Sequence, residues 1–216
     1  MTDDPKRIVA EGYDEIAPRY LAWSGLAPSP ERMQHLQRLL DLLPSDAEVL
    51  DLGCGAGVPV TQALAERCRV TGVDISSEQI ELARRHVPEE TFIQSDMAAL
   101  SFTPASFDAV IAFYSLTHVP RAEQAALLGR IAGWLRPGGL LMATMGAHDS
   151  PDTVEPDWLG VPMFFSHFDA DTNREMVRRA GLDIVDAEVV SEDENGELVE
   201  FLWVVARRLR DSALAG

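Results

Sequence analysis

The sequence predicts a doubly wound α/β fold, in which a mostly parallel sheet carries helices on both of its faces. Between residues 48 and 145, short apolar segments typical of strands alternate with segments of helical periodicity. The last third of the chain ends in two strand-like runs separated by a polar, acidic turn, which predicts an antiparallel hairpin. Together these observations predict a seven-stranded sheet whose last strand is antiparallel.

Composition favours a single domain over residues 1–216. A chain of 216 residues with 46% hydrophobic content can bury one sizeable core and is short for two. Acidic residues outnumber basic ones 35 to 18, and a net charge of −17 repels a phosphate backbone, so we expect no nucleic-acid partner. Cys54 and Cys68 have neither zinc-site spacing nor a disulfide framework, so no metal site is expected.

The same composition argues against a membrane protein. No stretch approaches the ~20 apolar residues of a membrane-spanning helix, and the polar, acidic N-terminus does not resemble a signal peptide. We therefore expect a cytoplasmic protein that does not bind membranes. A monomer and a homodimer are both compatible with the sequence.

Residues 1–45 predict two helices. In the first, apolar residues recur at helical spacing from Val9 to Tyr20, and we expect Pro18 to end or kink the helix. The second begins at the Ser29–Pro30 pair, which is typical of an N-cap followed by a first helical position, and stops at Pro44.

Residues 46–145 predict the central strands and helices. The strands are "EVLDL" (48–52), "RVTGVDI" (69–75), "TFIQSD" (91–96), "FDAVIAFY" (107–114) and "GGLLMATM" (138–145). One helix follows the first strand from about Val58, and another carries the apolar residues between 127 and 135. A third opens with the capping-box pattern from Ser76 to Gln79.

The residues after 145 do not continue this alternation of strands and helices. Residues 146–168 hold three prolines and large apolar side chains without a regular period, which predicts a loop that faces a binding site. Residues 169–210 predict a last helix, ended by Gly181, and the hairpin around "SEDENGE" (191–197).

A glycine-rich turn follows the first predicted strand in "VLDLGCGAGVPV" (49–60). It places backbone N–H groups and a helix N-terminus at the carboxyl edge of the sheet, where open α/β folds bind nucleotide-like ligands. The GxGxxG pattern of dinucleotide sites is incomplete, because Val58 stands where the third glycine belongs. Asp74, at the end of the second strand, suits the ribose of either NAD or an adenosyl cofactor, so these features alone leave both open.

Five segments decide between the cofactors. In order and at the right separations, "VLDLGCGAG", "VTGVDIS", "SDMAAL", "FDAVIAFYSLTHVP" and "WLRPGGLLMAT" resemble the class I S-adenosylmethionine-dependent methyltransferases. The resemblance covers about residues 8 to 208 and implies a Rossmann-like sheet and S-adenosylmethionine as the cofactor. It also implies that residues 1–45 form lid helices over the cofactor-binding core of residues 46–145.

The resemblance assigns residues to the methionyl part of the cofactor. The residues that match the acidic glycine loop packed against it are Asp51, Gly53, Gly55 and Gly57. "YDEIAPRY" resembles the family's lid helix, so Tyr13 and Tyr20 would cover the methionyl carboxylate. Both tyrosines are also compatible with ordinary contacts between a helix and the core.

The resemblance assigns further residues to the adenosine part. Asp74 would hold the ribose hydroxyls, and Ile75 would pack on the adenine. Asp96 would accept a hydrogen bond from the adenine amino group, with Met97 at the ring edge or simply packed in the core. Phe113 would lie beside the methionyl group at the end of the fourth strand.

A methyl group on a sulfonium needs little activation, so a base is required only when the acceptor carries a proton of high pKa. His118 and His148 follow predicted strands, and His167 lies at the end of the 146–168 loop, all at the ligand-binding edge; His118 is the first candidate for that base. His118 could instead brace the helix that follows it. His35 and His86 lie on predicted helices away from this edge and are expected to be solvated.

Aromatic residues predict the acceptor side. An apolar lid over a small, planar or greasy acceptor would be formed by Trp23, Trp158, Met163, Phe164, Phe165 and Phe168, unless some of them merely close the core. His148 and His167 would lie nearby. "AFYS" (112–115) stands where related enzymes acting on nucleic-acid bases or glutamine carry NPPY. This difference and the acidic composition favour a small-molecule acceptor.

The sequence leaves three functions open. The first is methylation of oxygen, nitrogen or carbon of a small metabolite. The second is methylation of a protein or RNA, which a basic docking surface would favour. The third is a non-methylating role of the bound cofactor, such as a cyclisation, for which the cofactor motifs would look the same.

Overall fold

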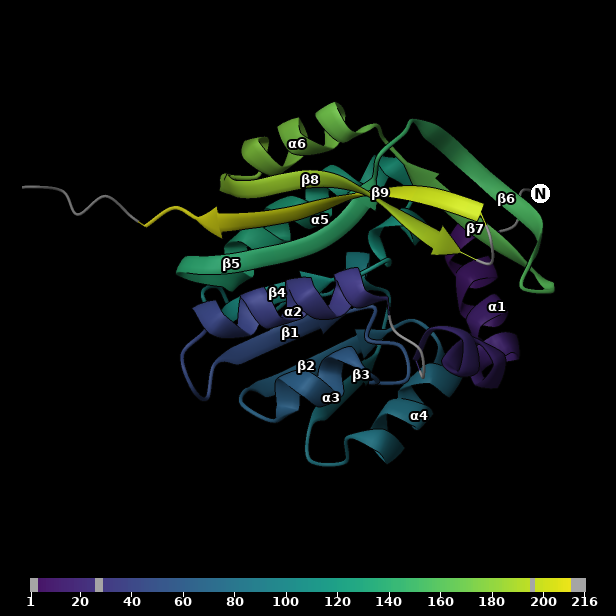
Figure 1. The fold of residues 1–216 in the computed structure, drawn as a ribbon, viewed down its shortest axis with the longest axis horizontal. Coiled ribbons are helices and arrows are strands. Elements are labelled where there is room, and N and C mark those ends of the chain that lie inside the picture. Colours follow the sequence, from purple (N-terminus) through teal and green to yellow (C-terminus); the bar gives the residue numbers. More distant parts are fainter. Residues whose placement is uncertain (1–3, 26–28, 195–196, 211–216) are drawn as a thin grey trace, which may run out of the picture.

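The structure, a computed structural model, describes residues 4–25, 29–194 and 197–210. Within these residues the main sheet has seven strands in the order β3-β2-β1-β4-β5-β9-β8 (Figure 1). The strands are β1 (Glu48–Leu52), β2 (Arg69–Asp74), β3 (Thr91–Gln94), β4 (Phe107–Ala112), β5 (Leu135–Gly146), β8 (Leu182–Glu194) and β9 (Glu197–Arg208). The first five are parallel, and β9 lies antiparallel between β5 and β8. The expected seven-stranded, mostly parallel sheet with an antiparallel last strand is confirmed.

Helices cover both faces of this sheet, as a doubly wound fold requires. α2 (Pro30–Leu42) and α3 (Val60–Ala65) pack on one face, and α5 (Arg121–Trp134) and α6 (Ala170–Arg179) pack on the other. α4 (Ser77–His86) lies against β2 and β3. None of the helices in these described segments combines the length and the hydrophobicity that crossing a membrane requires.

Local sequence signals account for the helix starts. The side chain of Ser29 accepts a hydrogen bond from the backbone N–H of Arg32, and Pro30 occupies the first helical position of α2. Ser76 caps α4 by accepting from the backbone N–H of Gln79 at 3.1 Å. Both predicted caps are confirmed.

The strand order reverses between β1 and β4, which are neighbours although two strands separate them in sequence. In open α/β sheets, ligands bind at such a switch point, outside the carboxyl ends of the strands. The glycine loop follows β1 there, and Phe113 follows β4. The fold therefore brings the two predicted segments to one crevice.

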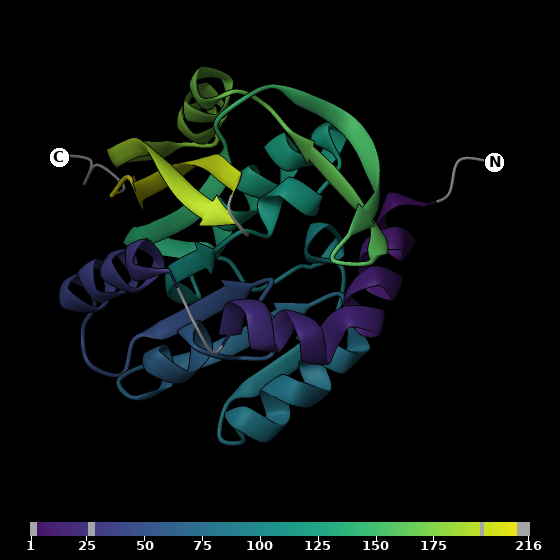
Figure 2. The same cartoon turned by 45° about the vertical axis from the view of Figure 1, so that its right-hand side comes forward.

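The prediction of a loop at residues 146–168 is wrong. β6 (Ser150–Trp158) and β7 (Val161–His167) form a separate antiparallel pair, visible as the green hairpin in Figure 2. They are joined by Leu159 and Gly160, which have φ angles of 51° and 89°, the left-handed conformation of a tight hairpin turn. All residues of β6 except its first and last are exposed, so the strand shows no alternation of apolar and polar side chains that would reveal it.

The prediction that the first helix breaks at Pro18 is also wrong. α1 (Pro5–Tyr20) runs through this proline and continues into one wide turn at Leu21–Gly25. Pro18 lies in the last turn of α1, where the loss of a single backbone hydrogen bond costs less than in the helix interior. At this end of the helix, the backbone N–H of Leu21 donates hydrogen bonds to the carbonyl oxygens of Ala17 and Pro18.

The two histidines expected in solvent are partly or fully covered. His35 is 5% exposed, and its ring stacks on Trp203 of β9 with centroids 4.1 Å apart. Burial lowers the pKa of His35. The Nδ1 of His86 lies 2.8 Å from the carbonyl oxygen of Ala56, so its ring helps to hold the glycine loop.

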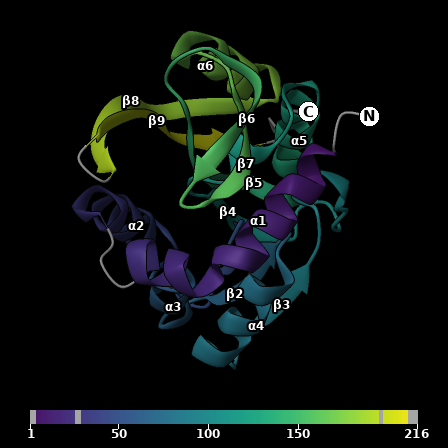
Figure 3. The same ribbon diagram turned by 90° about the vertical axis from the view of Figure 1, so that its right-hand side faces the viewer.

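Helix α1 lies between the β6–β7 hairpin and α4 (Figure 3). Gly12 allows the close approach to β7, because a Cβ there would lie 2.8 Å from Cε of Met163. On the other side, the carboxylate of Asp14 accepts from Ser76 Oγ at 2.6 Å, from Ser77 Oγ and from the backbone N–H of Glu78 at 3.1 Å. A carboxylate at this position also complements the positive end of the α4 dipole.

We expect Asp14→Ala to loosen α1, because it removes this acceptor from the N-terminus of α4. The variant should lose about 1 to 2 kcal/mol of stability, and hydrogen exchange in residues 5–20 should accelerate more than in the sheet. Glu15→Ala is the matched control, since Glu15 is an exposed carboxylate on the same helix. Equal exchange rates in α1 of both variants would contradict the anchoring role.

Candidate active site

A cavity opens at the switch point, outside the ends of β1, β2 and β4. We call it the inner cavity. Nine of the ten predicted cofactor-binding residues line it: Tyr13, Tyr20, Gly53, Gly55, Asp74, Ile75, Asp96, Met97 and Phe113. Asp51 lines an adjoining cavity beside the glycine loop, together with Gly53, Gly55 and Arg32.

The three glycines of the loop all have positive φ, but they are needed for different reasons. A Cβ on Gly53 would lie 2.3 Å from the Cβ of Ser115, and one on Gly57 would lie 3.2 Å from the Cα of Ala83 in α4. A Cβ on Gly55 would meet only the Oε1 of Gln79, at 3.8 Å. Gly53 and Gly57 thus serve packing within the protein, and Gly55 leaves the loop backbone open to the cavity.

Asp74 connects the loop to the start of α4. Its Oδ2 accepts from the backbone N–H of Gly55 and its Oδ1 from that of Ser76, both at 2.9 Å. Burial raises the pKa of Asp74 to about 6, although these N–H groups oppose the shift. The carboxylate lines the cavity and keeps lone pairs for a ligand hydroxyl.

Asp51 lies beneath the loop in β1 and is 3% exposed. Burial raises its pKa to about 7, against the hydrogen bond that it accepts from Thr61 Oγ1 at 2.6 Å. The neighbouring Asp74 charge adds to the rise. A group with this pKa holds a proton in part of the molecules at neutral pH, and a nearby ligand cation would favour its ionised form.

Gln79 is a residue that the sequence analysis missed. Its side chain is 1% exposed and lines the inner cavity, yet neither its Nε2 nor its Oε1 has a hydrogen-bond partner in the protein. The capping-box pattern points Gln79 back to the N-cap N–H, but Asp74 already accepts from that group. Such a buried, unsatisfied amide fits a polar ligand in the cavity.

Lys6 of α1 is a second residue that the sequence analysis missed. Its Nζ lies 2.7 Å from Asp96 Oδ2 and 2.7 Å from Glu123 Oε2, and Lys6 lines the inner cavity. The other oxygen of Asp96 accepts from the backbone N–H of Ala98 at 2.8 Å. The carboxylate expected at the adenine therefore also ties α1 to the sheet edge.

His118 is held at both ring nitrogens. Its Nδ1 lies 2.8 Å from the carbonyl oxygen of Phe164, and its Nε2 lies 2.9 Å from the hydroxyl of Tyr13. The side chain is partly buried at the cavity walls, and desolvation lowers its pKa to about 4 against the favourable contact with Phe164. His118 is therefore a neutral imidazole at physiological pH.

A second cavity of about 520 Å³ lies on the hairpin side of the first. We call it the aromatic cavity. Trp23, Trp158, Phe165 and His167 line it, as predicted for the acceptor side. Phe164 does not; it is 2% exposed and packs in a cluster with Val9, Ile16 and Met163 beneath α1.

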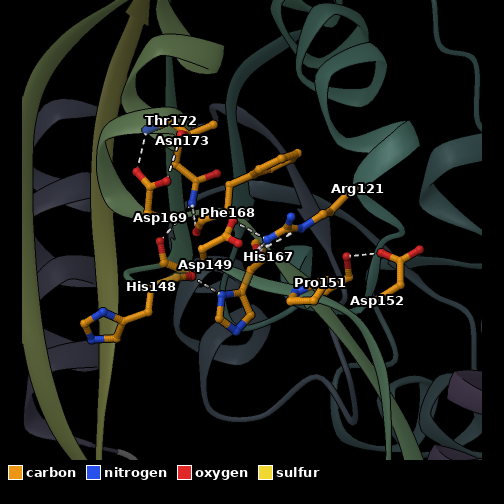
Figure 4. A network of polar contacts seen from close by, with 12 residues as sticks. Arg121, His148, Asp149, Pro151, Asp152, His167, Phe168, Asp169, Thr172 and Asn173 are labelled. Atoms are coloured by element: carbon orange, nitrogen blue, oxygen red, sulfur yellow. Dashed lines mark hydrogen bonds and ion pairs between the residues drawn. The ribbon is translucent and has the colours of Figure 1, made fainter.

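His148 also lies outside the aromatic cavity. Its side chain is 72% exposed, and its Nε2 pairs with Glu200 at 2.7 Å. Figure 4 shows its ring pointing away from that of His167, whose Nδ1 donates to the backbone carbonyl of His148 at 2.6 Å. Arg121 of α5 donates to the carbonyl of His167 and to Asp149, which ties the hairpin base to α5.

Tyr114 is the third residue missed from the sequence. It follows β4 with a φ of 56°, a left-handed conformation that is unusual for a bulky residue. Its hydroxyl donates to the carboxylate of Glu192 at 2.7 Å, and the guanidinium of Arg32 lies 4.5 Å from its ring centroid. These contacts hold the ring where the cavities adjoin.

Comparison with known proteins agrees with the motifs. Residues 49–139 match a family model described as a methyltransferase domain. Over 124 residues the chain is 36% identical to a ubiquinone biosynthesis O-methyltransferase of Xylella fastidiosa (strain 9a5c), which covers 55% of this chain and 48% of the relative. The chain spans about half the length of such curated relatives. Residues 49–139 therefore form a methyltransferase domain, in agreement with the resemblance of the motifs to the class I S-adenosylmethionine-dependent methyltransferases.

Solved structures agree with this methyltransferase fold. The 1,6-didemethyltoxoflavin-N1-methyltransferase of Burkholderia thailandensis, with bound 1,6-didemethyltoxoflavin and S-adenosylhomocysteine, has a TM-score of 0.72 at 22% identity, covering 94% of this chain and 88% of that one. The (4+2)-cyclase SpnF has a TM-score of 0.73 at 18% identity, covering 94% and 95%. At such identities these likenesses show the fold alone. Taken with the family match, they confirm the expected Rossmann-like fold of this methyltransferase domain.

The low pKa of His118 predicts a pH-dependent contribution to stability. Between pH 6.5 and 4 the unfolded chain binds a proton at His118 and the folded methyltransferase does not. The free energy of unfolding therefore decreases as pH falls through this range. His118→Gln removes the group that titrates. Its destabilisation relative to wild type, measured by denaturant unfolding, should shrink by about 2 kcal/mol between pH 7 and 5. A destabilisation that is constant over this range would contradict the prediction.

Proposed function

We propose that this protein transfers a methyl group from S-adenosylmethionine to a small molecule held in the aromatic cavity. The observation that carries the proposal is the meeting of the two cavities at shared residues. Tyr13, Tyr20, Tyr114 and His118 line both the inner and the aromatic cavity. A methyl donor in one and an acceptor in the other would therefore face each other across these four side chains.

The residues of the inner cavity fit the cofactor, which supplies an electrophilic methyl group on a positively charged sulfur. Asp74 would accept from the ribose hydroxyls and Ile75 would pack on the adenine, with Asp96 and Met97 at the edge of that ring. The unsatisfied amide of Gln79 lies beside Asp74 and Gly55 on the cavity wall, and we assign it to a polar group of the adenosine moiety.

The glycine loop and the lid would hold the methionyl part. Gly53 and Gly55 present backbone there, Asp51 lies beneath them, and Phe113 forms the side wall. Arg32 lines both the loop cavity and the aromatic cavity, where its positive charge suits a carboxylate. Tyr20 would close this end from α1.

The aromatic cavity supports a planar, largely apolar acceptor. Trp158 packs edge-on against Tyr13 and Trp23, with ring centroids 5.7 and 6.1 Å apart, so part of the cavity wall consists of packed aromatic rings. Closing this wall would exclude water, which otherwise competes with the acceptor for the methyl group. The names of similar proteins support a small acceptor, since one acts in ubiquinone biosynthesis and another carries bound 1,6-didemethyltoxoflavin.

Gln79→Leu separates a ligand-binding role from a structural one. Removing a buried amide that lacks partners should raise the thermal stability of the protein without cofactor by about 1 kcal/mol. The same change should weaken S-adenosylhomocysteine binding about tenfold in calorimetry. A variant that loses stability and keeps its affinity would show that Gln79 serves only the fold.

The function itself is tested with methyl-labelled S-adenosylmethionine and a metabolite extract, read by mass spectrometry. We expect a small-molecule product that carries the label, in an amount that requires active protein. A label found only on protein or RNA would contradict the proposed acceptor class. A new product of unlabelled, unchanged mass would indicate a rearrangement or cyclisation instead of methyl transfer.

A further inference from the structure

The hydrogen-bonding directions at the meeting point of the two cavities can be deduced from chemistry alone. The carbonyl oxygen of Phe164 has no hydrogen, so His118 Nδ1 must donate to it. A neutral imidazole carries its hydrogen on one nitrogen, which leaves a lone pair on Nε2. The hydroxyl of Tyr13 must therefore be the donor in its 2.9 Å contact with Nε2.

This arrangement commits the single hydrogen of the Tyr13 hydroxyl to His118. Toward any other group, the phenolic oxygen can act only as a hydrogen-bond acceptor. That oxygen belongs to a side chain that lines both cavities, so it lies where the methyl group would pass. A serine or a water at this place could turn and offer either a hydrogen or a lone pair.

Packing keeps the pair in this orientation. The His118 ring lies between Tyr13, with centroids 5.3 Å apart, and Phe165, at 4.8 Å. Tyr13 is in turn held edge-on by Tyr20 at 5.1 Å and by Trp158 at 5.7 Å. Neither ring can rotate freely without moving its neighbours, so the lone pairs of Tyr13 are oriented before a ligand binds.

We infer that Tyr13 and His118 form a proton-accepting pair, in which the Tyr13 oxygen contacts the hydrogen of the methyl acceptor and His118 acts through Tyr13. The inference rests on the proposed function and deepens it in two ways. The methyl acceptor is a hydroxyl or amine that carries a hydrogen, and Tyr13, not His118, is the catalytic residue that touches it. His118 is a positioning residue and the final proton acceptor.

The chemistry balances without a further reactant. The acceptor atom uses a lone pair to form a bond to the methyl carbon, while the carbon–sulfur bond breaks and its electron pair stays on sulfur. The hydrogen on the acceptor atom becomes strongly acidic as this bond forms. It moves to the Tyr13 oxygen while the phenolic proton moves to His118 Nε2, which leaves Tyr13 neutral and His118 as an imidazolium.

Charge balance explains why a weakly basic, partly buried histidine suffices. One positive charge disappears from sulfur as one appears on the imidazole, so the closed site gains no net charge. A histidine already protonated would place two cations in one cavity before the reaction, which burial disfavours. The imidazolium then returns its proton through Tyr13 to solvent when the site opens.

Two cofactor analogues test the inference without the natural acceptor. S-adenosylhomocysteine lacks the methyl group, and sinefungin carries an ammonium group in its place. An oxygen that can only accept should bind this ammonium, so wild type should prefer sinefungin. Tyr13→Phe should lower the ratio of sinefungin to S-adenosylhomocysteine affinity about tenfold in calorimetry, the loss expected for a hydrogen bond to a charged donor.

Two further variants serve as comparisons. Tyr20→Phe removes the hydroxyl of the other α1 tyrosine on the same wall and should change both affinities by the same factor. His118→Ala releases the hydrogen of Tyr13, so it should lower the ratio even though the phenolic oxygen is still present. A merely structural His118 would leave the ratio unchanged and reduce both affinities together.

The outcomes separate this inference from the proposed function. If Tyr13→Phe weakens both analogues equally, or neither, Tyr13 is at most a cover for the cofactor and the inference is overturned, while methyl transfer stands. If wild type binds S-adenosylhomocysteine but shows no preference for sinefungin, the inference is also overturned. If wild type fails to bind S-adenosylhomocysteine, the proposed function fails, and the inference fails with it.

Discussion

The two hydrogen bonds that the Asp74 carboxylate accepts are the interactions on which the rest of the site depends. One oxygen holds Gly55 of the loop after β1, and the other holds the N–H of Ser76, where α4 begins. The hydroxyl of Ser76 in turn donates to Asp14 of α1 while it caps α4. A single buried charge therefore sets the positions of the loop, the helix and the lid relative to one another, and its solvation loss is offset by the backbone N–H groups it accepts from.

Most of the core could be predicted because its signals are local. Strand and helix periodicity, the cap at Ser76 and the N-cap pair at Ser29–Pro30 each depend on residues within a few positions of one another. The β6–β7 hairpin escaped prediction because β6 is exposed on nearly its whole length and carries two prolines, so its partner strand alone defines it. Likewise, His35 looked solvated because its cover, Trp203, lies in a strand at the other end of the chain.

In the site too, features set by nearby residues or by topology could be predicted, and features set by contacts between distant segments could not. Motif spacing brought the residues at the ends of β1, β2 and β4 to one cavity, since topology determines where parallel strands end. Motif spacing could not show why position 53 requires glycine. The reason is the close approach of Ser115, which follows β4 in the sequence. The partners of His118 were equally hidden. Tyr13 and Phe164 come from α1 and β7, and only their convergence on one ring shows that both nitrogens of the imidazole already have partners.

The independence of the β6–β7 hairpin has a consequence for how such an enzyme diversifies. The hairpin forms its own two-stranded sheet and meets the rest of the protein mainly through side chains on α1. Its outer strand and its turn can therefore be lengthened, shortened or exchanged without breaking a backbone hydrogen bond of the main sheet. Under the proposed function, selection for a new acceptor could change one wall of the aromatic cavity while the glycine loop and the helices around the inner cavity stay unchanged.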